Sequence, residues 1–136
     1  MKAVKIVAVL LLVYASVVVI FESLLGYYQP ENQGTMVITT KDDEGNPHPR
    51  VVARLESDDT LYVAVNHWPR IWYYQALDNP NVTIEIDGET SDYQAIEIEG
   101  QEYDRVNSDH ALGPVFRILT GFPPRRILRL DPQAGD

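Results

Sequence analysis

The chain has 136 residues, which is enough for one small folded domain once an apolar N-terminal segment is set aside. Its 11 basic and 20 acidic residues give a formal net charge of −9, so broad electrostatic binding to nucleic acid phosphates is not expected. The absence of cysteine excludes disulfides, thiolate nucleophiles and thiolate-ligated metal centres. The three histidines lie far apart without a metal-binding spacing, and no metal site is predicted.

Residues 1–28 are predicted to form a membrane anchor. An uncharged run covers residues 6–21, and with Glu22 near the headgroups it extends to the roughly 20 residues that cross a bilayer core. A cleaved signal peptide is the competing interpretation, but the small-x-small cleavage site is missing. We therefore expect one uncleaved single-pass helix. Lys2 and Lys5 precede the span, which favours a cytoplasmic N-terminus and an extracytoplasmic domain.

A polar linker at 29–34 separates the anchor from a domain predicted over 35–132, with a short tail at 133–136. Alternating apolar residues between Gly-, Pro-, Asn- and Asp-rich turns predict strands at 35–40, 50–56, 60–66, 81–87, 92–99 and 125–130. Helix start and stop signals predict helices at 69–77, 100–111 and 113–121. A sheet-rich chain of this size protects its edges by closing. We expect a mainly β fold, a small barrel of about six antiparallel strands with flanking helices.

Positive charge is concentrated in two stretches of this acidic chain. Acidic residues are absent from 45–55 and from 60–77, and these stretches contain three arginines. Arg50 and Arg54 share one face of an extended strand, and we expect them to project outward together if the opposite face is in the core. Arg70 follows at a helix start, where unpaired N–H groups and the helix dipole favour an anion.

The aromatic residues beside Arg70 have two interpretations. Trp68, Trp72 and Tyr73 could stack on a flat ring system near a bound phosphate. Trp72 and Tyr73 could equally be core residues of a helix, which is the commoner role for large aromatics. His67 could be a plain turn residue, and Asn66 could only cap the helix.

The segment "WPRIWYYQALDNPNVTIEIDGETSDYQAIEI" resembles the deazaflavin-dependent nitroreductase and quinone reductase family. The similarity is carried by Pro69, Trp72, Tyr73, Leu77 and the closing Asn79-Pro80 pair. This resemblance implies a split β-barrel of the pyridoxamine-phosphate oxidase type, with a deazaflavin (F420) or FMN cofactor. Two family elements differ, since "KDDEGNPHPR" and "NHW" stand where the family has glycine-rich sequences. The identity of the ring cofactor therefore stays open.

The resulting functional hypothesis is a membrane-anchored oxidoreductase that transfers hydride to a quinone-like or nitro acceptor, with a homodimer as a possible assembly. The alternative is a non-enzymatic module that binds a cofactor or ligand on the same fold. No catalytic side chain is predicted, because the cofactor would supply the chemistry. The predicted cofactor-binding residues are Arg50, Arg54, Asn66, His67, Trp68, Arg70, Trp72 and Tyr73.

Overall fold

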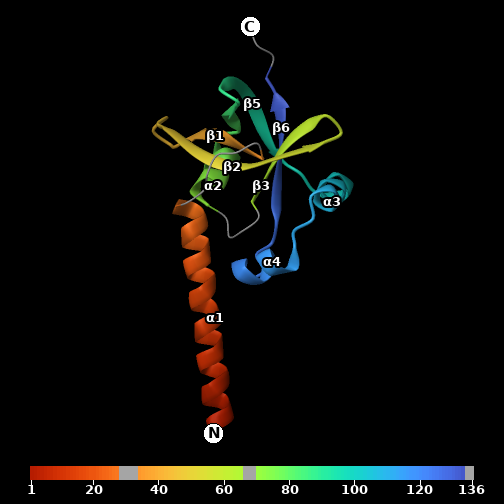
Figure 1. Cartoon of the computed structure of the whole chain (residues 1–136). Coiled ribbons are helices and arrows are strands. Elements are labelled where there is room, and N and C mark those ends of the chain that lie inside the picture. The colour runs from red at the N-terminus through yellow and green to blue at the C-terminus, as the bar shows by residue number, and fades with distance from the viewer. Residues whose placement is uncertain (28–33, 66–69, 134–136) are drawn as a thin grey trace.

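In a computed structural model, six antiparallel strands close into a β-barrel and one long helix projects away from it (Figure 1). The structure describes residues 1–27, 34–65 and 70–133. The strands are β1 (Thr35–Lys41), β2 (Pro47–Ser57), β3 (Thr60–Val65), β4 (Asn81–Ile86), β5 (Glu89–Glu97) and β6 (Arg126–Pro132). The helices are α1 (Lys2–Tyr27), α2 (Ile71–Asp78), α3 (Gly100–Asp109) and α4 (Pro114–Thr120). The predicted fold class is confirmed.

Local hairpins and long-range pairings together close the barrel. β1, β2 and β3 form an antiparallel meander, and β4 and β5 form a hairpin. β6 then fits between β3 and β5, while β1 pairs with β4, which gives the closed order β1-β2-β3-β6-β5-β4. Each of the six strands is paired with a neighbour on both sides, which limits the free edges that act as a template for aggregation.

The inner face of β2 is the reverse of the expected one. Val52 is only 6% exposed and belongs to the cluster inside the barrel, whereas Val51 is half-buried. Arg50 pairs with the inward-facing Ile38, and Arg54 pairs with the inward-facing Val63. Paired residues on neighbouring strands share a face, so both arginines lie on the inner-facing side of β2.

Two hydrophobic clusters hold the domain together. The first fills the barrel with residues from β1 to β6 and from α2. The second lies outside the barrel and packs α3 against the sheet; its buried residues are Leu55, Tyr62, Ala64, Ile98, Val106 and Ile127. Leu55, on the face of β2 opposite the two arginines, is buried under α3 and not inside the barrel. Each strand in this region therefore has apolar residues on both faces.

Helix α4 begins and ends as its sequence predicts. Pro114 occupies the first turn, where its missing N–H costs nothing. Gly121 adopts φ 78° at the C-terminal cap, a left-handed conformation that glycine enters without a steric penalty. This punctuation fixes the length of the helix to 114–120.

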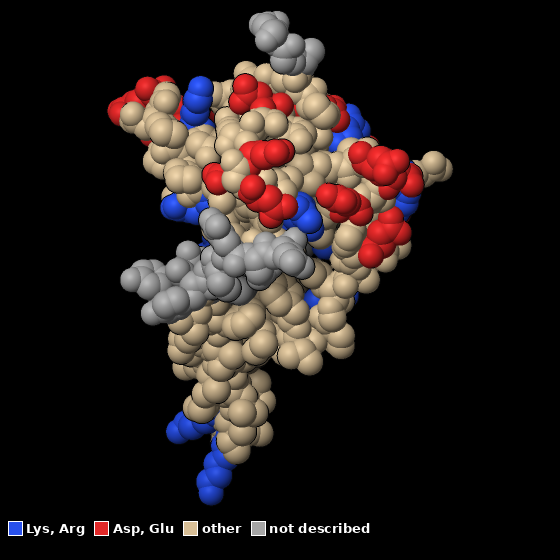
Figure 2. Space-filling model, turned by 45° about the horizontal axis from the view of Figure 1, so that its top comes forward, with Lys and Arg blue, Asp and Glu red and all other residues tan. Residues whose placement is uncertain are grey.

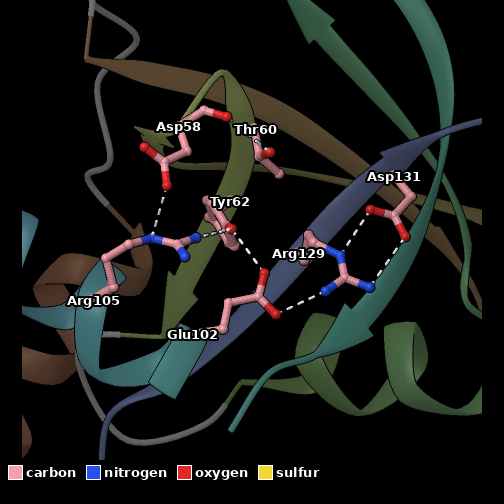
Figure 3. A network of polar contacts seen from close by, with 7 residues as sticks. All are labelled: Asp58, Thr60, Tyr62, Glu102, Arg105, Arg129 and Asp131. Carbon is pink, nitrogen blue, oxygen red and sulfur yellow. Dashed lines mark hydrogen bonds and ion pairs between the residues drawn. The ribbon is translucent and has the colours of Figure 1, made fainter. Parts of the chain in front are cut away.

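A polar network fastens α3 to the barrel (Figure 3). The Tyr62 hydroxyl donates to Glu102 Oε2 at 2.8 Å, and Arg129 Nη1 donates to Glu102 Oε1 at 2.7 Å. Arg129 also donates to Asp131 at 2.8 Å, and Arg105 to the Tyr62 hydroxyl oxygen at 3.1 Å. Burial alone would raise the pKa of Glu102, but the bonds from Tyr62 and Arg129 lower it below its ordinary value of 4.5.

Helix α1 leaves the barrel as a long apolar rod. Its segment Lys2–Leu24 has a mean hydropathy of 2.8 and is long enough to cross a membrane. The most apolar 18-residue stretch of that segment is not buried, which distinguishes it from a core helix, whereas Glu22 near the domain end is buried. A signal sequence would have the same length and composition. Figure 2 shows blue basic side chains at its free end and red carboxylates gathered over the barrel domain.

Replacing Glu102 by Gln should lower the free energy of unfolding at neutral pH by about 1 kcal/mol, because a charge-assisted bond from Arg129 is lost at a partly exposed site. Since the folded state lowers the pKa of Glu102, this contribution is complete above pH 4.5 and declines as the pH falls below that value. Urea unfolding in detergent across this range measures both effects. Asp104→Asn on the exposed side of α3 is the control, and an equal loss in the control would contradict the prediction.

Candidate functional site

One end of the barrel is covered by α2, and this end is called the α2 end. β1, β3 and β5 finish there, and β2, β4 and β6 begin there, because all neighbouring strands are antiparallel. Trp72 is 6% exposed, Tyr73 3% and Ala76 1%, and all three belong to the barrel cluster. The helix also contacts β1, where the Thr40 hydroxyl donates to Gln75 Oε1 at 2.7 Å. Helix α2 therefore plugs the barrel.

Tyr73 is tied to two charged residues at this end. Its hydroxyl donates to Glu97 Oε1 at 3.0 Å, and Arg126 Nη1 lies 3.3 Å from the same oxygen. Burial, followed by the hydrogen bond to Glu97, raises the pKa of Tyr73 to about 12. The phenol is therefore neutral at physiological pH and acts as a donor.

Arg70 joins the start of α2 to the end of the long apolar helix. It is the N-cap residue of α2, one position before the helix, and Pro69 lies outside the described residues. Its Nη2 donates to Glu22 Oε2 at 2.9 Å and also to the Glu22 backbone carbonyl. The Glu22 side chain is only 8% exposed, so this is a largely buried ion pair. The buried Nε of Arg70 has no partner among the described residues.

The two β2 arginines carry charge with little compensation. Arg50 is exposed, and its Nη1 donates to the carbonyl of Pro49 at 3.1 Å; it pairs with no carboxylate in the described ranges. Arg54 Nε lies 3.9 Å from Glu56 Oε1, a long and partly exposed pair of little energy. Arg54 is four positions after Arg50, which corresponds to about 13 Å along a strand. Arg50 is therefore the one nearer the α2 end.

The structure brings Arg50, Arg70, Trp72 and Tyr73 to the α2 end and leaves Arg54 farther along β2. Leu77, the last position of the helix predicted at 69–77, is 40% exposed. Asn66, His67 and Trp68, also predicted for this site, lie outside the described residues.

Sequence reasoning missed Glu97 and Arg126. Glu97 stands two residues beyond Ala95, which is buried in the barrel, and Arg126 pairs with the buried Val65. The two-residue period of a strand would have placed both on the inner face. A third acid-free stretch, 110–130, was also available as a signal, since it contains four arginines.

A hollow lies at the opposite end of the barrel, beside the β4–β5 turn. It has a volume of about 360 Å³. Its lining contains two carboxylates, from Asp87 and Glu89, and no basic side chain. An anionic ligand would be repelled there, so the charge pattern favours the α2 end for such a ligand.

A family model described as "F420H(2)-dependent quinone reductase" matches residues 16–112. The match extends from within α1 to the segment after α3 and includes all of α2. Among curated proteins, none matches the chain.

Solved structures share the fold at low sequence identity. A heme storage protein from Vibrio cholerae, HutZ, has a TM-score of 0.59 and 21% identity, covering 76% of this chain and 84% of its own. An F420-H2 dependent reductase, FDR-A, has a TM-score of 0.56 and 16% identity, covering 76% and 99%. A chain described as a domain-swapped dimer has a TM-score of 0.60 and 18% identity, covering 81% and 92%.

Replacing Tyr73 by Phe should lower the free energy of unfolding at neutral pH by about 1 kcal/mol, because the hydrogen bond to Glu97 is lost inside the barrel end. Folding raises the pKa of Tyr73 from 10.0 to about 12, so its contribution is complete below pH 10 and declines as the pH rises toward 12. The difference between wild type and variant should therefore narrow above pH 10 in urea titrations. Tyr74→Phe is the matched control at a 53% exposed neighbour, and an equal loss there would overturn the prediction.

Proposed function

The chain belongs to the F420H(2)-dependent quinone reductase family, and on that premise we propose that it is a membrane-anchored reductase. It would bind reduced deazaflavin F420 at the α2 end and reduce a quinone-like or nitro acceptor. The observation that carries the proposal is the family match over residues 16–112, which includes the helix that plugs this end.

The residues of the α2 end fit an anionic cofactor. F420 carries a phosphate-containing acidic tail, and guanidinium groups bind phosphate and carboxylate well. Arg50 has no carboxylate partner among the described residues, and Arg70 has a buried N–H without an acceptor. Both groups have unused capacity to donate to an anion. FMN, also phosphorylated, would satisfy the same charges, and the family favours F420.

The protein's own residues would hold and orient this cofactor. Arg50, Arg54 and Arg70 would bind the acidic tail. Asn66, His67 and Trp68, which precede Arg70 in the sequence, are proposed as further cofactor contacts. Trp72 and Tyr73 would form the packed wall behind the site, consistent with their burial. The bound deazaflavin supplies the hydride, so the protein's contribution is binding and orientation. The neutral Tyr73 hydroxyl keeps Glu97 in place.

Purified full-length protein in detergent should take up F420 saturably. Arg50→Ala should weaken this binding roughly 10- to 100-fold, because a charge-assisted hydrogen bond contributes about 1.5–3 kcal/mol. Fluorescence titration measures the dissociation constant. The control is Arg105→Ala on α3, outside the barrel. Absence of uptake by wild type, or equal weakening by both variants, would sink the proposal.

Arg70 is tested with its partner, because Arg70→Ala alone removes the guanidinium from a largely buried carboxylate and destabilises the fold. The double variant Arg70→Ala, Glu22→Gln is therefore compared with Glu22→Gln. Weaker F420 binding in the double variant only would assign a cofactor contact to Arg70.

A non-enzymatic ligand-binding module is the second candidate. It is favoured by the fold similarity to HutZ, described as a heme storage protein, although identity of 21% supports the fold alone. Turnover separates the two candidates. Binding of F420H2 without oxidation on addition of a soluble quinone would favour the module.

Helix α1 is proposed to stay attached as a single-pass anchor. Support comes from contacts between α1 and the domain: Glu22 with Arg70, Tyr14 with Ile118, and Phe21 with Phe116. Removal of a signal sequence would break them. The lysines before the span favour an extracytoplasmic domain, and a C-terminal reporter fusion tests that side. We also propose that two copies of the chain form a homodimer.

Protein isolated from membranes should have the intact mass of all 136 residues and resist extraction by alkaline carbonate. The physical reason is that a span of 23 residues with mean hydropathy 2.8 partitions stably into a bilayer. Intact-mass spectrometry measures retention. A mature form that lacks the first two dozen residues would establish cleavage instead.

A further inference from the structure

Helix α4 exposes more apolar surface than a water-facing helix of a small domain normally does. Val115 is 68% exposed, Ile118 47%, and Phe122, just past the helix end, 57%. Val115 and Ile118 are three residues apart and lie on one side of the helix, and Phe122 follows directly after its C-cap. Scattered exposed apolar residues are common, but a group of large ones marks an interaction surface. Val115, Ile118 and Phe122, together with Arg117, are called the α4 surface.

The α4 surface lies beside the apolar helix. The Tyr14 hydroxyl donates to the backbone carbonyl of Ile118 at 2.8 Å, and the rings of Phe21 and Phe116 meet edge to face at 5.9 Å. Figure 1 shows α4 alongside the domain-proximal half of α1. The two contact positions on α1 are about 10.5 Å apart along its axis. The α4 surface is therefore continuous with the surface of the proposed anchor.

The position of these contacts on α1 determines how deep α4 would lie in a bilayer that α1 crosses. Tyr14 precedes Glu22 by eight residues, about 12 Å along the axis, and Lys5 precedes Glu22 by about 26 Å. With Lys5 and Glu22 near the two boundaries of a core about 30 Å thick, α4 lies within about 12 Å of the domain-side boundary. Interfacial helices lie at comparable depths, about 5–10 Å into the headgroup and acyl boundary.

The charge of this region suits a lipid surface. Residues 110–124 contain no aspartate or glutamate in a chain whose net charge is −9, and Arg117 is the basic residue of the α4 surface. Arg117 has no ion pair with a described carboxylate, and its guanidinium lies 5.8 Å from the centre of the Phe122 ring. An arginine above an apolar side chain is the arrangement that snorkels toward headgroups.

Phe122 adds an independent observation. It adopts φ 55°, a left-handed conformation that is unfavourable for a bulky residue. An exposed ring in water gains no burial free energy that could offset this backbone strain. Burial of the ring in an apolar layer would offset it.

We propose that the α4 surface is a second membrane contact and that its occupant is the lipid bilayer. The depth argument uses the anchor proposed above, but the contact itself is separate, because α4 lies beyond residue 112, where the family match ends. Both contacts together hold the α2 end of the barrel close to the lipid.

The test uses the full chain in phosphatidylcholine vesicles with and without phosphatidylglycerol. Because the chain has no cysteine, single cysteines can be labelled without background. An environment-sensitive fluorophore is placed by Val115→Cys on α4, by Val9→Cys on α1, and by Thr90→Cys in the far hairpin turn as the aqueous control. Nitroxide-labelled lipids quench probes in the bilayer, and iodide quenches probes in water.

The Val115→Cys probe should be quenched severalfold more by nitroxide lipids than the Thr90→Cys probe, as the Val9→Cys probe should also be. Adding Arg117→Glu should reduce this quenching in phosphatidylglycerol vesicles, and Arg105→Glu should not.

A Val115→Cys probe as accessible to iodide as Thr90→Cys would overturn the proposal. If Val9→Cys is then deep in the lipid, the anchor stands and only the α4 contact fails. If Val9→Cys is aqueous while Val115→Cys is in lipid, the anchor fails and the α4 contact stands. Shielding of Val115→Cys that depends on protein concentration, without lipid quenching, would assign the surface to a second copy and also overturn the proposal.

Discussion

Helix α2 fills one end of the barrel, and the burial of Trp72 and Tyr73 there is the constraint on which the rest of the structure depends. A six-stranded barrel of this kind needs side chains to occupy its interior. Two large aromatic rings with Ala76 between the strands supply that volume from outside the sheet. The N-terminus of α2 is thereby fixed beside the strand ends, and Arg70 is fixed with it.

The ion pair between Arg70 and Glu22 connects the start of α2 to the apolar helix α1. Two charges taken out of water cost free energy unless geometry and hydrogen bonds compensate. Here the guanidinium reaches both the carboxylate and the backbone carbonyl of Glu22. Glu22 interrupts an apolar segment, and the pairing gives its charge a partner at the place where that segment meets the domain. The buried Nε of Arg70 remains available for an acceptor.

Local signals predicted much of the fold. The hairpin turns, the proline and glycine of α4, and the alternation in β4 follow from interactions among neighbouring residues, which a sequence displays directly. The insertion of β6 between β3 and β5 depends on pairings between distant segments, and no local pattern encodes it. The face of β2 was misjudged because both of its faces are apolar in part, with Val52 inside the barrel and Leu55 under α3.

The candidate site was predicted in part for the same reason. The charge pattern identified Arg50 and Arg70 without knowledge of their partners. The link of Arg70 to Glu22 spans 48 positions, and that of Tyr73 to Glu97 spans 24. Such pairs become visible only when the strand order places β5 and the end of α1 next to α2. The sequence alone therefore indicated the arginines at the α2 end but not the groups that accept hydrogen bonds there.

The contacts of α4 with α1 also set a rotational angle. Tyr14 and Phe21 are seven residues apart, so they lie on nearly the same stripe of the helix, and both face α4. Each residue of an α-helix advances by about 100°. A one-residue insertion between Tyr14 and Phe21 would therefore turn one of these contacts away from α4. The rotation of the apolar helix about its own axis is therefore fixed relative to the domain, and this rotation determines which side of the barrel faces its surroundings.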